Sequence, residues 1–195
     1  MAKRVFFCFH YEDVKSFRAN VVRNHWVTKD DREVAGFFDA SLWEETKKRG
    51  KPALKRLING GLENTSATSV LIGSQTYIRP WVRYEILKSL KRGNNIFGVH
   101  INGIPDKNKN TKNSGPNPFD YLGIKYSNEG NRLTMYEWKN GSWATYTGID
   151  DSSSYLIERT SSTYWGKFFR LSKFYSTYLW NKDNGYNNFS KWVGD

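Results

Sequence analysis

Short hydrophobic runs alternate with longer amphipathic segments over the first half of the chain. The runs at residues 4–9, 34–38, 70–72 and 96–101 are almost wholly apolar, which is typical of parallel strands buried on both faces. Between these runs, apolar residues recur at helical spacing. This alternation of strand and helix predicts an α/β fold, in which helices cover both faces of one parallel sheet.

Three helices are expected between these strands. The first carries apolar residues on one face, namely Val14, Phe17 and Val21. The second and third are expected to begin at Pro52 and Pro80, because the fixed φ of proline suits the first helical turn. Gly60-Gly61 is expected to end or fray the second helix, and Gly93 to end the third. The stretch from residue 40 to 51 carries charges of both signs and is expected to be a longer loop, or a loop with one helical turn.

The character of the chain changes after the fourth predicted strand. Residues 102–118 are rich in Asn, Lys, Gly and Pro, which predicts an exposed loop. Asn140-Gly141 lies between two apolar runs and predicts a β-hairpin, and the apolar spacing between residues 165 and 180 predicts a closing helix. We therefore expect a main domain over residues 1–125 and an extension over residues 126–195 packed on the same domain.

The third strand and the helix after it place candidate chemistry at one edge of the sheet. In a flavodoxin-like strand order the first and third strands are neighbours, and ligands bind outside their carboxyl ends. Trp81 and Glu85 are four residues apart, so they lie on one stripe of the helix. A Glu on a helix is most often a solvated carboxylate paired with a nearby base. The position of Glu85 beside the core-facing stripe, one turn from the helix start, instead favours a role in the crevice.

Seven further residues are expected to face this crevice and to contact a substrate: Phe9, His10, Tyr11, Asp39, Trp43, Ser74 and Trp81. A purely structural role stays open for several of them. Trp81 fits packing at the helix start, His10 fits contacts with the local backbone, and Ser74 fits capping of the next loop. No residues show the spacing of metal ligands, and neither a metal nor a cofactor is expected.

Composition narrows the class of protein. A single cysteine, Cys8, excludes a disulfide framework and a cysteine-based metal site. No apolar run is long enough to span a membrane, so the chain is expected to be soluble and cytoplasmic. The net charge is +11, and more than half of it falls between residues 51 and 100. A basic surface suits a phosphorylated ligand, and a nucleic-acid-binding α/β domain stays an alternative, although no DNA-binding motif is present.

Several motifs together resemble the TIR (Toll/interleukin-receptor) family in its enzymatic branch. The resemblance is close to the TIR proteins of the bacterial Thoeris anti-phage systems and runs along the whole chain. The residues that carry it are Val5–Tyr11, Asp39–Glu44, Val70–Ser74, Trp81-x-x-x-Glu85 and Asn117–Gly123. In that branch a helix-borne Glu at this spacing is the catalytic residue of NAD cleavage, so the resemblance assigns this role to Glu85.

The resemblance implies a bacterial enzyme that makes a cyclic ADP-ribose isomer from NAD after phage infection. NAD would be its substrate, a phage-derived component its trigger, and a separate effector the target of the diffusible nucleotide. No membrane and no specific nucleic acid is implied as a partner. The stretch from residue 40 to 51 does not resemble the BB loop of receptor-type TIR domains, so adaptor contacts are not inferred. A non-catalytic TIR scaffold that works by self-assembly stays an alternative.

The chemistry of NAD fits a single carboxylate. Nicotinamide is already a cationic leaving group, so its departure needs no general acid. The transition state is a ribosyl oxocarbenium ion, as in glycoside hydrolysis, and one well-placed carboxylate can stabilise it. Cyclisation further requires an enclosed pocket that excludes water and holds an internal nucleophile near the reacting carbon.

Overall fold

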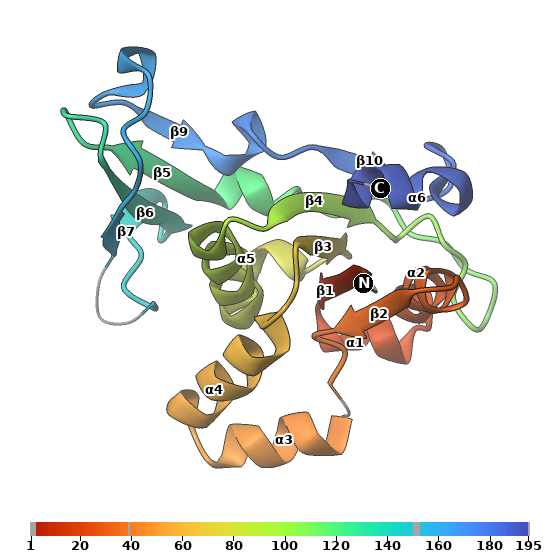
Figure 1. Ribbon diagram of the computed structural model, residues 1–195. Helices are drawn as coiled ribbons and strands as arrows, with labels where there is room; N and C mark the ends of the chain where they lie inside the picture. The colour runs from red at the N-terminus through yellow and green to blue at the C-terminus, as the bar shows by residue number, and fades with distance from the viewer. Residues whose placement is uncertain (1–2, 39, 150–152, 195) are drawn as a thin grey trace. The chain divides into compact units, whose positions relative to one another are not determined.

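The computed structural model describes residues 3–38, 40–149 and 153–194 (Figure 1). None of its helices, over these residues, is long and apolar enough to cross a membrane.

The chain divides into two compact units. One consists of residues 1–116 together with residues 177–195, and the other of residues 117–176. This division differs from the expected boundary after residue 125, because the end of the chain returns to the first unit and adds a strand to its sheet.

The first unit is built on a five-stranded sheet in which every neighbouring pair is parallel. The strand order is β2-β1-β3-β4-β10, so the first and third strands are neighbours and the flavodoxin-like prediction is confirmed. The strands are β1 (Lys3–Cys8), β2 (Arg32–Ala35), β3 (Ala67–Ile72), β4 (Asn95–His100) and β10 (Thr177–Leu179).

Helices cover both faces of this sheet (Figure 1). On one face, α2 (Arg18–Val27) and α6 (Gly185–Val193) bury Trp26 and Phe189 against the strands. On the other face, α5 (Pro80–Arg92) contacts β1, β3 and β4, and α4 (Lys51–Leu62) packs beside it. Gly93 ends α5 in the left-handed conformation with a φ of 77°, as predicted, because glycine has no Cβ to clash there.

The first predicted helix is two helices. Phe17 has a φ of 65° and separates α1 (Tyr11–Lys15) from α2, and its side chain is 52% exposed instead of facing the core. A left-handed residue other than glycine costs about 1 kcal/mol. The break places Arg18, which is buried, at the start of α2. The apolar spacing does not reveal the break at Phe17, because a pattern of apolar and polar residues places an arginine such as Arg18 on the surface.

The predicted loop over residues 40–51 is wrong, because residues 40–48 form helix α3 (Ala40–Lys48). Straight-chain residues favour a helix there, and ion pairs link neighbouring turns. Glu44 Oε2 lies 3.7 Å from Lys47 Nζ, and the Glu45 carboxylate pairs with the Arg49 guanidinium. Charges of both signs at these spacings are a helix signal that the sequence interpretation assigned to a loop.

The second predicted helix, α4, continues through Gly60 and Gly61 to Leu62. Glycine is needed at residue 61, since a Cβ there would lie 2.9 Å from the Phe38 ring and 3.1 Å from the Phe6 ring. Gly61 therefore allows the helix to pass close to two aromatic rings, and it does not end the helix.

The second unit is antiparallel. Its strands are β5 (Leu122–Tyr126), β6 (Arg132–Lys139), β7 (Ser142–Thr145), β8 (Ser154–Leu156) and β9 (Phe168–Arg170), in the order β7-β6-β5-β9 with β8 beside β6. The predicted hairpin is confirmed, because Asn140 and Gly141 join β6 to β7 with φ values of 52° and 78°. Both residues therefore have the positive φ that a type I′ turn requires.

The predicted closing helix between residues 165 and 180 is wrong. This segment holds β9, a single turn of 3₁₀ helix (Leu171–Lys173), and β10. Phe168 and Phe169 pair with β5, and residues 177–179 pair with β4. Aromatic residues favour pleated surfaces, and apolar spacing over a short segment fits two strands as well as one helix.

The two glycines of α4 give a matched test of this packing. We expect Gly60→Ala to raise the free energy of unfolding by about 0.5–1 kcal/mol, because Gly60 has open space around it and alanine favours a helix interior. We expect Gly61→Ala to lower it by about 1 kcal/mol or more, because the added methyl meets Phe38 and Phe6. Urea unfolding measures both, and equal effects at the two positions would contradict the proposed contact.

Candidate active site

A pocket of about 620 Å³ lies at the carboxyl end of β1, between that strand end, α3 and the first turns of α5. Six of the residues predicted for the site line it: Phe9, His10, Tyr11, Trp43, Trp81 and Glu85. The structure thus brings together residues that lie far apart in the sequence. Their contact with a substrate stays a prediction.

Glu85 lies in the second turn of α5 and is only 5% exposed. Its Oε2 atom is buried and makes no hydrogen bond with any part of the chain that the structure describes. Burial raises the pKa of Glu85 to about 8, and a hydrogen bond with the Cys8 thiol acts in the opposite direction. An unpaired carboxyl held out of water is costly, and a cation in the pocket would relieve that cost by favouring the ionised form.

Cys8 is the residue at this site that the sequence interpretation missed. It is fully buried as the last residue of β1. Its thiol also lies against α5, with Sγ 3.8 Å from the Val82 carbonyl oxygen, and it hydrogen-bonds Glu85. Burial and the nearby Glu85 both raise the pKa of the Cys8 thiol, so it stays neutral and can donate. The signal was its position at the carboxyl end of the strand that α5 covers.

Aromatic rings form the walls of the pocket. Trp81 contacts Tyr84 edge-to-face at 5.8 Å between ring centroids, and Trp43 stacks on Phe38 at 6.1 Å. Both tryptophans are half-buried, so part of each ring faces the open volume. Trp43 comes from α3, the helix that stands in place of the expected loop. A wall of this kind excludes water and offers flat surfaces to a ring of the substrate.

Basic side chains stand at the same pocket and were not predicted individually. Lys15, Lys47 and Arg79 line it. Lys15 pairs with Glu12 at 2.9 Å, and Arg79 hydrogen-bonds Gln75 through one guanidinium nitrogen. The Nε atom of Arg79 is buried without a hydrogen-bond partner among the described residues. These donors suit a diphosphate.

His10 follows β1 and lines both this pocket and a second, neighbouring pocket of about 420 Å³. Burial and then the charge of Arg79 lower the pKa of His10, so the imidazole is neutral at pH 7. Its Nε2 atom is buried and finds no hydrogen-bond partner in the described chain.

Two predicted residues do not join the pocket that holds Glu85. Ser74 is exposed and lines the second pocket, where its Oγ accepts a hydrogen bond from Asn102 Nδ2 at 2.9 Å. The chain turns at Gly73, and Ser74 lies on the side of the loop that follows β4, so its contact with a substrate stays a prediction. Asp39 lies outside the described residues.

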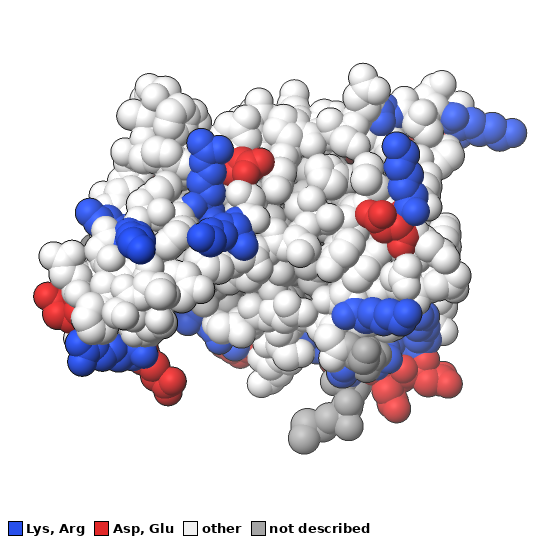
Figure 2. All heavy atoms as spheres, turned by 90° about the horizontal axis from the view of Figure 1, so that it is seen from above, with Lys and Arg blue, Asp and Glu red and all other residues white. Residues whose placement is uncertain are grey.

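The basic character of the chain is dispersed on the face drawn in Figure 2. Lys and Arg side chains there form separate groups, and several stand beside Asp or Glu. Nucleic-acid-binding domains usually show a basic patch or stripe, and the separate groups on this face do not favour that alternative. Within the described ranges, no group of three or more His, Cys, Asp and Glu residues is placed to hold a metal ion.

The fold agrees with the comparisons to known proteins. Residues 6–106 match the family model described as Thoeris protein ThsB, TIR-like domain. The chain therefore belongs to the TIR-like family of Thoeris proteins. A protein of Bacillus cereus (strain MSX-D12) named "Putative cyclic ADP-D-ribose synthase ThsB1" is 58% identical over 194 residues, which cover 99% of this chain and 100% of that protein.

The burial of Glu85 predicts a pH-dependent effect on stability. Because its pKa is raised from 4.5 to about 8, the folded state keeps a proton that the unfolded state releases over this range. Wild-type stability therefore falls as the pH rises through this window. We expect Glu85→Gln to be more stable than wild type by roughly 1–4 kcal/mol at pH 9, and by little at pH 4.

Urea unfolding at the two pH values tests this expectation. Glu33→Gln, which removes a carboxylate from the exposed surface of β2, controls for the change in net charge. A Glu85→Gln protein that is no more stable than wild type at pH 9 would contradict the raised pKa that burial gives to Glu85.

Proposed function

We propose that this protein cleaves NAD between nicotinamide and ribose and joins the ADP-ribose product into a cyclic isomer. The observation that carries the proposal is the buried carboxyl group of Glu85, whose Oε2 atom has no hydrogen-bond partner among the described residues, in a pocket with aromatic walls and basic donors. The name of the 58% identical relative supports the same reaction. The pocket has room for the nicotinamide riboside half of NAD.

The reaction follows from the charges in the pocket. The bond between C1′ of the ribose and the nicotinamide nitrogen breaks, and its electron pair leaves with nicotinamide as a neutral molecule. The positive charge moves to the ribose as an oxocarbenium ion, which the Glu85 carboxylate stabilises. A nucleophile of the adenosine end attacks C1′ and loses its proton, which gives the cyclic isomer. Attack by water in its place gives linear ADP-ribose.

The pKa of Glu85 fits this sequence of events. In the free protein the carboxyl is mostly protonated at neutral pH, because its pKa is about 8. The cationic nicotinamide ring favours ionisation when NAD enters the pocket, so the carboxylate forms where it is needed. Trp43 and Trp81 shield the oxocarbenium ion from water. We expect their replacement by Ala to lower the ratio of cyclic to linear product.

The biological role that we propose is anti-phage signalling in the cytoplasm. A phage-derived component would trigger the enzyme, and the cyclic nucleotide would activate a separate effector. A trigger is needed because constant cleavage of NAD would harm the host cell. The alternative of a non-catalytic TIR scaffold predicts no turnover of NAD, and the next experiment separates the two.

We expect Glu85→Gln to fold normally and to lose at least a hundredfold in the rate of nicotinamide release, because the substitution keeps the shape and removes the charge. Mass spectrometry, after incubation of the protein with NAD and lysate from infected cells, measures the cyclic isomer and linear ADP-ribose. Glu44→Gln, an exposed carboxylate at the same pocket, is the matched control and should keep activity within a fewfold. Near-normal product from Glu85→Gln would overturn the catalytic assignment.

The pH profile tests the role of the carboxylate directly. We expect kcat/KM for NAD to rise with pH, to be half-maximal near pH 8 and to level off above it, because the free enzyme must ionise Glu85 and the pKa of that group is about 8. The Cys8 hydrogen bond lowers this pKa, so Cys8→Ala should move the rise to higher pH. A profile that is flat from pH 6 to 9 in both proteins would contradict an ionised Glu85 as the active form.

A further inference from the structure

The second pocket, of about 420 Å³, is lined by polar and charged residues. It shares His10, Glu12 and Lys15 with the pocket that holds Glu85, so the two pockets meet along the segment that follows β1. Its remaining walls come from the start of α2, the turn after β3 and the loop after β4. A polar pocket beside a pocket with aromatic walls is suited to a different part of the same elongated ligand.

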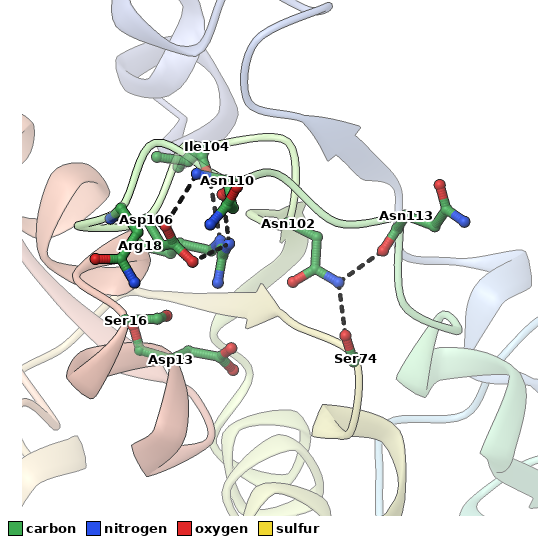
Figure 3. Close-up of polar contacts among 10 residues, drawn as sticks. Asp13, Ser16, Arg18, Ser74, Asn102, Ile104, Asp106, Asn110 and Asn113 are labelled. Atoms are coloured by element: carbon green, nitrogen blue, oxygen red, sulfur yellow. Dashed lines mark hydrogen bonds and ion pairs between the residues drawn. The ribbon is translucent and has the colours of Figure 1, made fainter.

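The wall formed by the loop after β4 is held in place by buried polar contacts (Figure 3). Arg18 is 1% exposed, and its guanidinium donates to the carbonyl oxygens of Ile104 at 2.9 Å and Asn110 at 2.8 Å. It also pairs with Asp106 at 3.3 Å, and Asp106 Oδ1 accepts hydrogen bonds from two backbone N–H groups of the loop. The positive charge of Arg18 is thus used to fix the loop and is not available to a ligand.

Asn102 fixes the other end of the same wall. It is 1% exposed, and its Nδ2 donates to Ser74 Oγ at 2.9 Å and to the Asn113 carbonyl oxygen at 2.7 Å (Figure 3). The predicted exposed loop is therefore tied to α2 through Arg18 and to the turn after β3 through Asn102. The pocket is preformed, which lowers the entropy cost of binding.

Asp13 is the feature of this pocket that calls for a ligand. Only 8% of it is exposed, and its Oδ2 atom is buried with no hydrogen-bond partner among the residues that the structure describes. It rests directly on the end of β3, since a Cβ at residue 73 would lie 2.3 Å from Asp13 Oδ1, which requires the glycine found there. A buried acceptor left without a donor costs about 1–3 kcal/mol, so this position does not serve stability.

Burial raises the pKa of Asp13 to about 6, while the charges of Arg18 and Lys112 act in the opposite direction. The group is therefore an acceptor at neutral pH. The donors that match a carboxylate at close range are the adjacent hydroxyl groups of a ribose. Lys107 and Lys112 line the same pocket and supply positive charge for a phosphate.

We propose that this second pocket binds the adenosine monophosphate half of NAD, with the ribose hydroxyl groups on Asp13 and the phosphate near Lys112. The proposal rests on the proposed function for its choice of nucleotide. It places the two halves of the dinucleotide in neighbouring pockets and the diphosphate at their shared edge, beside His10 and Lys15. Both ends of the substrate are then held close together, as ring closure requires.

Binding measured without catalysis tests this assignment independently of the reaction. The full chain carrying Glu85→Gln is titrated with AMP in a calorimeter, alone and with Asp13→Asn, Lys112→Gln or Asp30→Asn added. We expect Asp13→Asn to weaken AMP binding about tenfold or more and Lys112→Gln to weaken it severalfold. Asp30→Asn makes the same change in net charge at an exposed site before β2, and should have no effect.

Two further titrations, with nicotinamide mononucleotide and with NAD, test which half of NAD the second pocket binds. Nicotinamide mononucleotide lacks the adenosine half, so its affinity should not change with Asp13→Asn, whereas the affinity for NAD should fall with that for AMP. Circular dichroism confirms that each variant is folded. An AMP affinity that is unchanged by Asp13→Asn, or an equal loss for nicotinamide mononucleotide, would overturn the proposal.

A loss for AMP without a loss for NAD would also overturn it, since the pocket would then take a separate nucleotide. If the wild-type protein fails to cleave NAD while AMP binds through Asp13, the proposed function fails and the nucleotide site stands. The two failures are therefore distinguishable.

Discussion

The burial of the Glu85 carboxyl group at the carboxyl end of β1 is the constraint on which the site depends. A carboxyl group in this position needs a helix that crosses the strand end closely, and α5 does so with Cys8 beneath it. The Cys8 thiol provides one hydrogen bond to the carboxyl group, whereas the Oε2 atom has no hydrogen-bond partner among the described residues. The fold thus carries an electrostatic cost that a cationic substrate would offset, which is a common arrangement at active sites.

Four buried polar atoms that have no hydrogen-bond partner within the described chain belong to residues that line the two neighbouring pockets. They are Glu85 Oε2 and Arg79 Nε in the first pocket, His10 Nε2 at the shared edge, and Asp13 Oδ2 in the second. Native proteins pair nearly all of their buried polar groups, so a group of exceptions in one hollow marks a place for a ligand. The carboxyl groups of Glu85 and Asp13 lie in separate pockets, and the neutral imidazole of His10 and the cationic Lys15 lie where the two pockets meet. This order suits the two ribose units of a dinucleotide with the diphosphate between them.

Much of the first unit could be predicted from the sequence. Apolar runs mark β1, β3 and β4, because strands buried on both faces have no polar side to show. Pro80 marks the start of α5, because proline restricts φ to a helical value, and Gly93 marks its end, because glycine can adopt the left-handed conformation. Glu85 and the residues after β1 could be placed at one crevice because parallel strands bring their carboxyl ends to one edge of the sheet. These signals are local or follow from topology alone.

Other features were decided only by tertiary contacts. The segment that holds β9 and β10 has helical spacing, but pairing with β5 in one unit and with β4 in the other makes it two strands. The side of the turn on which Ser74 lies depends on Asn102, 28 residues away along the chain. The contact of Cys8 with Glu85 joins a strand to a helix, and the buried Arg18 joins α2 to a distant loop. The sequence alone determined the strands, the helix that carries Glu85 and the edge where the site lies, because hydrophobic pattern and backbone preference act locally. Only the tertiary structure decided which polar side chains share a pocket and which lack partners, because burial and pairing depend on residues that folding brings together from afar.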